Sequence, residues 1–140
     1  MTIIDGKNLK LGRLASNVAK RALEGEEIII INSEKCVVTG NKKSVIKDKR
    51  EMRQIGTRYK GPFLPKRADR IVKRAIRGML PYKRKRGREA MARIRTHIGI
   101  PEEFVEQAKN AETVEEADLG VVLKKNYITI ERLSREEGYE

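Results

Sequence analysis

Apolar and basic residues recur at helical spacing between residues 65 and 79, and each kind forms its own stripe along a predicted helix. The apolar stripe consists of Ala68, Ile71, Val72, Ala75, Ile76 and Met79, and the opposite stripe of Lys66, Arg67, Arg70, Lys73, Arg74 and Arg77. The apolar stripe must pack against other apolar groups. Cations three and four residues apart repel each other at a small cost per pair, and only Asp69 offsets them. The basic stripe is therefore either a solvated face or a surface for a polyanion.

Four consecutive isoleucines, Ile28–Ile31, predict a strand that is covered on both faces, because a half-exposed strand alternates apolar and polar residues. A short strand at 2–4 and a helix at 13–24 precede this run. The order strand, helix, strand is typical of a right-handed crossover between parallel strands. The sequence thus predicts an α/β fold with a parallel sheet between helices.

The other elements follow from shorter patterns. A helix that starts near Pro65 would place proline where its missing N–H costs nothing. The remaining predictions are an apolar run at 35–39, a charged helix at 42–54, a loop rich in glycine and proline at 56–65, a basic loop at 82–87, a helix at 88–93, strands at 94–98 and 127–130, and a helix at 131–137.

Charge is distributed unevenly along the 140 residues, whose formal net charge is +12. Residues 1–41 carry 6 Lys and Arg against 5 Asp and Glu, residues 42–95 carry 21 against 4, and residues 101–140 carry 5 against 11. A basic block of this kind indicates a surface directed at one partner. We expect an RNA-binding core at 1–100 and an acidic extension at 101–140 that packs on the core or on neighbouring proteins, because so few apolar positions make a poor independent domain.

The chain lacks the known catalytic and cofactor motifs, because the spacing is wrong or the required residues are too few. The segment Gly6–Gly12 follows a strand and opens a helix, but its glycines are six apart and lack the Lys-Ser/Thr pair of a phosphate loop. We interpret it as a turn that starts the helix close to the sheet. One histidine, His97, and one cysteine, Cys36, cannot supply a zinc site, and His97 has no carboxylate partner in sequence. We expect a packed histidine, no metal, no cofactor and no small-molecule substrate.

Nothing in the chain predicts a membrane or secretory protein. No apolar run approaches the roughly 20 residues that a membrane span requires, and the first residues lack a secretory pattern. The basic helix lacks the Trp or Phe anchors of a membrane-surface helix. The single Cys36 cannot form an internal disulfide, which suits a cytoplasmic location.

The basic tetrapeptide Lys83–Arg86 extends the positive surface of the helix before it. Alone it could be a nuclear import signal, a protease site or a phosphate clamp. Together with the helix it favours contact with a nucleic-acid backbone, where each neutralised phosphate releases counterions. Aromatic residues are only 4% of the chain, which argues against a platform for base stacking. Structured RNA, read by shape and phosphate position, fits better.

Two segments form a specific signature: Ile76-Arg-Gly-Met-Leu-Pro81, followed by the basic loop with Gly87-Arg88, and Ile94-Arg-Thr-His-Ile-Gly-Ile-Pro101. This signature resembles that of the large-subunit ribosomal protein L-thirteen family, and the resemblance covers nearly the whole chain. Thr96 and His97 depart from the family pattern, which usually has an aliphatic and then an aromatic residue there. Further matches are Gly12–Ser16, Val18–Lys20, Ile31–Lys35 and Thr39-Gly40.

The resemblance implies a three-layer α/β/α domain with a central four-stranded, mostly parallel sheet. It also implies binding to large-subunit rRNA, contact with neighbouring ribosomal proteins and a part in subunit assembly. The short connection before Ile28, the closing segment Leu133–Tyr139 and the small size resemble the archaeal branch of the family.

The predicted function is that of a cytoplasmic, ribosome-bound structural protein and not of an enzyme. The alternatives are an α/β enzyme that processes or modifies RNA, and a free regulator that binds its own messenger. The expected RNA-binding residues are Lys42, Lys43, Arg58, Lys60, Lys66, Arg67, Arg70, Lys73, Arg74, Arg77, Lys83, Arg84, Lys85, Arg86 and Arg88.

Overall fold

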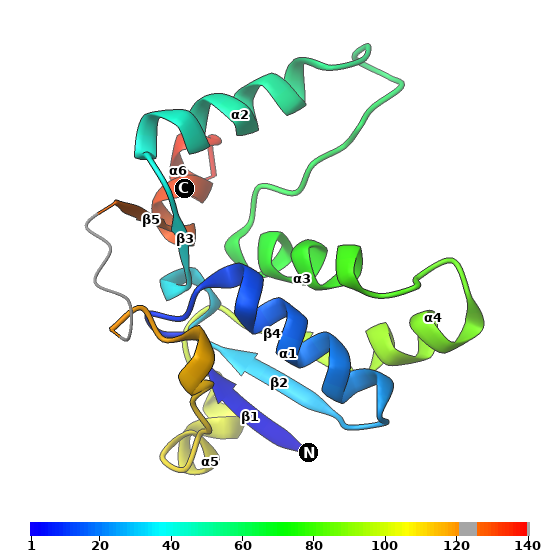
Figure 1. Cartoon of the computed structure of the whole chain (residues 1–140), viewed down its shortest axis with the longest axis vertical. Coiled ribbons are helices and arrows are strands. Elements are labelled where there is room, and N and C mark those ends of the chain that lie inside the picture. Colours follow the sequence, from blue (N-terminus) through cyan, green and yellow to red (C-terminus); the bar gives the residue numbers. More distant parts are fainter. Residues whose placement is uncertain (121–125, 140) are drawn as a thin grey trace.

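A parallel sheet of three strands lies at the centre of the computed structural model, which describes residues 1–120 and 126–139 (Figure 1). The strands β1 (Thr2–Asp5), β2 (Ile28–Ile31) and β4 (Ile94–Thr96) are ordered β1-β2-β4. Thr2 pairs with Ile28, and Ile28 pairs with Ile94. All four isoleucines of β2 are buried, so the predictions of a covered strand and of an α/β fold are confirmed.

The two faces of the sheet are covered unequally. Helices α1 (Leu11–Leu23), α3 (Ala68–Met79) and α4 (Lys85–Ala92) lie on one side, where Ile28 and Ile30 join the main apolar core (Figure 1). On the other side, Ile29 and Ile31 pack with residues of a short segment that includes α5 (Val105–Ala108). The alternation of side chains along β2 therefore divides its isoleucines between two apolar clusters, as expected of a three-layer arrangement.

Among the residues that the structure describes, the main sheet has three strands and not the four that the resemblance implies. Strand β3 (Val37–Thr39) pairs antiparallel with β5 (Tyr127–Thr129) in a separate sheet. The chain leaves the main sheet at Asn32, whose φ of 51° is left-handed, and continues into the 3-10 turn η1 (Ser33–Lys35). The amide groups of Asn32 and Ser33 donate to the carbonyl groups of Gly99 and His97, which fixes this change of direction.

Helix α2 (Lys42–Gln54) has the bounds that the sequence predicts, and it projects from the rest of the domain (Figure 1). The side chain of Asn41 caps it by accepting a hydrogen bond from the Lys43 amide at 3.0 Å. No residue of α2 is buried, although Val45 and Ile46 contact the core. A loop of residues 55–67 returns from the far end of α2 to α3.

The described part of the acidic extension shares the main apolar core. It comprises η2 (Glu102–Phe104), α5, η3 (Glu115–Ala117), β5 and α6 (Ile130–Glu136). Buried core residues of this part are Val114, Ala117, Ile128, Ile130 and Leu133. The division of the chain at residue 100 stays a prediction.

The positions that depart from the family pattern are accommodated at the end of β4. Thr96 donates its hydroxyl to the carbonyl oxygen of Asp69 at 3.1 Å, which links β4 to α3. His97 is half-buried, and its ring centroid lies 6.0 Å from that of Phe104. The predicted packing of His97 is thus observed. No helix in residues 1–120 or 126–139 is long and apolar enough to cross a membrane.

Candidate nucleic-acid interface

Helix α3 carries the predicted basic stripe and is anchored by its apolar stripe. Ala68, Ile71, Val72 and Ile76 are buried, and α3 packs against α1. The last predicted member, Met79, is 45% exposed, because the helix ends there and Leu80 turns into the core instead. The apolar anchor is therefore confirmed except at its carboxyl end.

The start of α3 differs from the prediction. Helical structure begins at Ala68, with Arg67 as the capping residue, so Pro65 and Lys66 lie before the helix. Ser134 of α6 donates its hydroxyl to the Lys66 carbonyl at 2.5 Å, and the next residue, Arg67, has an extended backbone. Lys66 and Arg67 are exposed and flank the helix, whereas the sequence had predicted them on it.

Four of the predicted cations meet in one open hollow of about 290 Å³, which Pro65 and Met91 complete. These cations are Arg70, Lys73, Arg74 and Arg77. None of the four forms an ion pair with a carboxylate in the part of the chain that the structure describes. Asp69, the acid of this helix, pairs with Arg67 instead, at 3.1 Å. The hollow thus concentrates positive charge that no described carboxylate neutralises, and its guanidinium groups can bind oxyanions bidentately.

One of the four cations of the hollow, Arg77, packs against an aromatic ring. The guanidinium carbon of Arg77 lies 4.9 Å from the centroid of the Tyr82 ring, within the range of a cation–π interaction. Tyr82 belongs to the turn that follows α3, so the contact joins the end of the helix to the basic segment after it. The contact leaves the guanidinium N–H groups of Arg77 available to an anion.

The predicted basic loop is shorter than expected, because α4 begins at Lys85 and not at Arg88. The Arg84 amide donates to the Pro81 carbonyl at 2.9 Å and closes the turn before the helix. Lys83, Arg84, Lys85, Arg86 and Arg88 are all exposed. Lys85 lies 3.9 Å from Glu89, an exposed pair that contributes little to stability.

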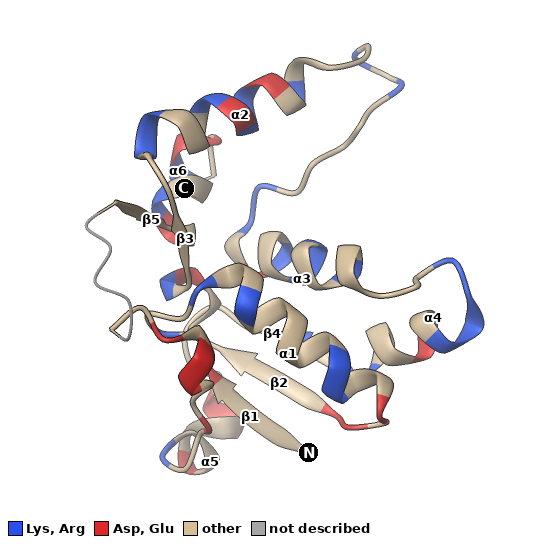
Figure 2. Cartoon of the chain, viewed as in Figure 1, with Lys and Arg blue, Asp and Glu red and all other residues tan. Residues whose placement is uncertain are grey.

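The other four predicted residues form a second group. Lys42 and Lys43 lie in the first turn of α2, and Arg58 and Lys60 lie in the loop that follows this helix. In Figure 2, basic residues mark α2 and its loop in one region, and α4 with the turn before it in another. The sequence predicts one surface, and the structure divides it into these two groups.

Two cations that the prediction omitted belong to this second group. Lys47 and Arg50 line a hollow of about 500 Å³ together with Lys43. Their spacing of four and seven residues from Lys43 places all three on one face of α2, a periodicity that the sequence already contains. Acidic groups also line this hollow, and Arg50 pairs with Glu136 at 3.2 Å. Its positive charge is therefore partly neutralised.

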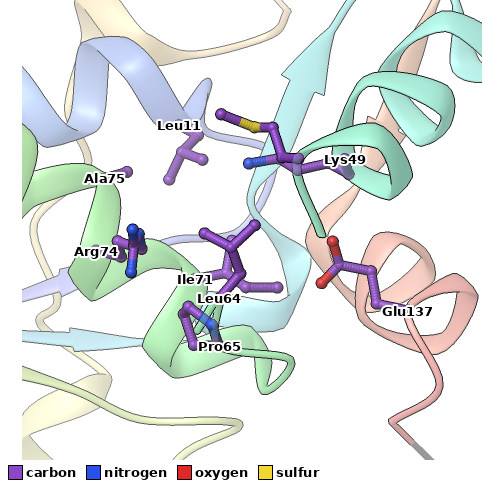
Figure 3. Close-up of a pocket in the computed structure, with 9 residues that line it drawn as sticks. Leu11, Lys49, Leu64, Pro65, Ile71, Arg74, Ala75 and Glu137 are labelled. Atoms are coloured by element: carbon purple, nitrogen blue, oxygen red, sulfur yellow. The ribbon is translucent and has the colours of Figure 1, made fainter. Parts of the chain in front are cut away.

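A third cavity, of about 170 Å³, lies where α1, α2, α3 and α6 meet (Figure 3). Leu11, Ile71 and Ala75 give it apolar walls, and Lys49, Arg74 and Glu137 supply its charges. Arg53 of α2 donates to the Glu137 carboxylate at 2.6 Å. Burial raises the pKa of Glu137 despite the attraction of Arg53, because loss of solvent penalises its charged form.

Within the described residues, no three His, Cys, Asp or Glu side chains come close enough together to hold a metal ion. The ionisable side chains that line the hollow on α3 are all cationic, so no acid among them could act as a general base.

Fold and surface together define a class: an α/β protein that mounts a cluster of unneutralised cations on one helix. The chain belongs to the ribosomal protein L13 family, whose model matches residues 1–103. It is 46% identical over 138 residues to the large ribosomal subunit protein uL13 of Methanococcoides burtonii, covering 99% of this chain and 98% of the relative. The protein of the same name from Methanosarcina barkeri is 48% identical over 141 residues, covering 99% and 98%. That of Methanopyrus kandleri is 49% identical over 140 residues, covering 99% and 87%.

Family membership confirms the resemblance found in the sequence, including its archaeal type. These relatives are named as ribosomal proteins and not as enzymes, so the prediction of a non-enzymatic protein is confirmed as well. The predicted cytoplasmic, ribosome-bound location is that of ribosomal proteins in general.

Proposed function

We propose that this protein is a structural constituent of the large ribosomal subunit that binds large-subunit rRNA and supports subunit assembly. The observation that carries this proposal is the hollow on α3, where four cations lie together without a described carboxylate partner. Holding like charges close together is unfavourable unless an anion occupies the site. The names of the relatives supply the assembly in which such an anion would be found.

In this proposal, the sheet and its helices form a rigid mount. The apolar face of α3 fixes the helix to α1, and the opposite face directs its cations at phosphate groups where RNA helices converge. Exposed cations of α4 and its preceding turn extend the contact. The cations of α2 and its loop contact a neighbouring stretch of RNA backbone. They include Lys42, Lys43, Arg58 and Lys60. The exposed acidic residues of η2 and η3 are suited to a basic neighbouring protein.

The decisive experiment removes charge from the hollow and measures how RNA binding depends on salt. The variant carries Arg70→Gln, Lys73→Gln and Arg74→Gln, which leave the buried stripe of α3 intact. Each phosphate contact contributes roughly 0.7–0.9 to the slope of log affinity against log salt, so the slope should fall by about 2–3. Between roughly 50 and 200 mM salt, the wild-type protein should lose about 20–40-fold more affinity for large-subunit rRNA than the variant loses.

The matched control removes the same number of charges elsewhere. Lys7, Lys35 and Lys109 are exposed and lie outside both basic groups, so their replacement by Gln should leave the slope nearly unchanged. Equal slopes for the two triple variants would show that the hollow does not contact phosphate. Thermal melting of both variants verifies that the fold is preserved.

The rival function, an RNA-processing or RNA-modifying enzyme, is separated by a second assay. A structural constituent co-sediments with large subunits from cell lysate and leaves bare RNA unchanged. Turnover of bare RNA by the purified protein would favour the enzyme.

A further inference from the structure

The loop between α2 and α3 exposes large apolar side chains to an unusual extent. We call residues 55–64 the arm. Ile55 is 64% exposed, Tyr59 83% and Phe63 73%, so the arm holds the two most exposed aromatic residues that the structure describes. Large apolar groups gathered on a protein surface mark an interaction site, because their hydration is unfavourable.

The arm tip has a defined shape. The amide of Lys60 donates to the Thr57 carbonyl at 3.2 Å, which makes 57–60 a closed turn. A methyl group at Gly56 would lie 2.1 Å from the Gly61 carbonyl oxygen, so the two ends of the tip touch. Arg58 and Tyr59 therefore stand at the end of a compact loop.

The charge of the arm identifies the partner. The arm contains two cations, Arg58 and Lys60, and no acid, and Lys66 and Arg67 follow it before α3 begins. The Arg58 guanidinium carbon lies 5.8 Å from the centroid of the Tyr59 ring, so cationic and aromatic groups are interleaved. Flat rings beside cations match a ligand that combines π faces with phosphates, as unstacked nucleotides do. The chain leads directly from the arm to the hollow on α3, because Pro65, the residue after the arm, lines that hollow.

We propose that the arm binds unpaired bases of RNA, which stack on Tyr59 and Phe63 while α3 holds the neighbouring phosphates. This inference rests on the proposed function and adds to it the kind of RNA that the protein selects: a helix junction or bulge with unstacked nucleotides, as opposed to a continuous duplex.

The test compares two RNA duplexes that differ only in a bulge containing a fluorescent adenine analogue. The full-length wild-type protein should bind the bulged duplex more tightly than the paired one and should change the fluorescence of the analogue. Tyr59→Ala and Phe63→Ala should each weaken binding to the bulged duplex by about 5- to 150-fold, the range for loss of one base–aromatic stack, and should leave binding to the paired duplex nearly unchanged.

Conservative variants separate stacking from apolar burial. Tyr59→Phe keeps the ring and should retain the preference for the bulge, whereas Tyr59→Leu keeps an apolar side chain without a ring and should lose it. The side chains of Tyr59 and Phe63 are exposed, so all of these variants should have the same melting temperature as the wild-type protein.

Three results would overturn the inference in different ways. Equal affinity for both duplexes, with the salt dependence intact, would refute the arm's role and leave the hollow on α3 as the RNA site. Binding to neither duplex would count against the proposed function itself. A third measurement uses vesicles that contain anionic lipid. If Tyr59→Ala impaired binding to the vesicles and not to RNA, the arm would be assigned to a membrane and the proposal would be refuted.

Discussion

The close contact between Gly87 and Pro81 provides a sharp test of how the basic segment is held. Gly87 is buried in the first turns of α4, and a methyl group there would lie 2.1 Å from the Pro81 carbonyl oxygen and 2.3 Å from its carbonyl carbon. These are backbone atoms of the turn that presents Lys83 and Arg84. Gly87→Ala therefore forces α4 and this turn apart, because no flexible side chain can move aside.

The cost is the difference between two terms. Separation of the backbone segments by roughly 1 Å resembles overpacking of a core, which costs about 1–3 kcal/mol, and the backbone atoms involved favour the upper part of that range. Alanine gains up to about 1 kcal/mol over glycine inside a helix. We expect a net loss of about 1–2 kcal/mol in the free energy of unfolding. In a chain of this size, that loss lowers Tm by roughly 3–10 °C.

Gly78→Ala is the matched control for this change. Gly78 lies in α3, is exposed, and has no atom within 4 Å of the position that a methyl group would take. The control should gain about 0.5–1 kcal/mol. Denaturant unfolding, followed by circular dichroism, measures both variants. A Gly87→Ala variant as stable as Gly78→Ala would refute the reasoning, since it would mean that the turn yields without cost.

Two further predictions concern ionisable groups. Hydrogen bonds from Arg21 and Thr2 lower the pKa of Glu26 to about 2, from its ordinary value near 4.5. This carboxylate stabilises the fold above pH 4.5 by about 1–2 kcal/mol after solvent screening, and the stabilisation should disappear as the pH falls from 4.5 toward 2. In the Glu26→Gln variant, the free energy of unfolding should therefore change less with pH in that window. Burial raises the pKa of Cys36 to about 12, and the side chain is fully buried, so a thiol reagent should label it only in denaturant. Rapid labelling of the native protein would contradict that expectation.

Elements with a strong local pattern could be predicted from the sequence. The run Ile28–Ile31 specified a covered strand, and the bounds of α2 were correct because its composition changes sharply at both ends. The sheet to which β3 belongs could not be predicted. Its partner β5 lies about ninety residues further along the chain, and the separation from the main sheet depends on the left-handed conformation of Asn32.

The candidate site shows the same division between local and distant information. The cations on α3 share one helix, so periodicity alone placed Arg70, Lys73 and Arg74 together. The start of that helix was misplaced, since the sequence pattern does not show that Arg67 is extended beside a tertiary hydrogen bond from Ser134. Composition shows that aromatic residues are few, but it could not show which of them are exposed, because the exposure of Tyr59 depends on the three-dimensional path of the arm.

The attachment of α2 has a consequence for how the protein meets its surroundings. Two guanidinium groups, those of Arg50 and Arg53, join this helix to α6, and no residue of α2 is buried beneath them. Ionic strength weakens exposed charge pairs far more than it weakens apolar packing. Salt should therefore weaken the exposed Arg50–Glu136 pair and largely spare the Arg53–Glu137 pair, whose carboxylate is only 5% exposed. At high ionic strength α2 is then held by that buried pair and by the contacts of Val45 and Ile46 with the core.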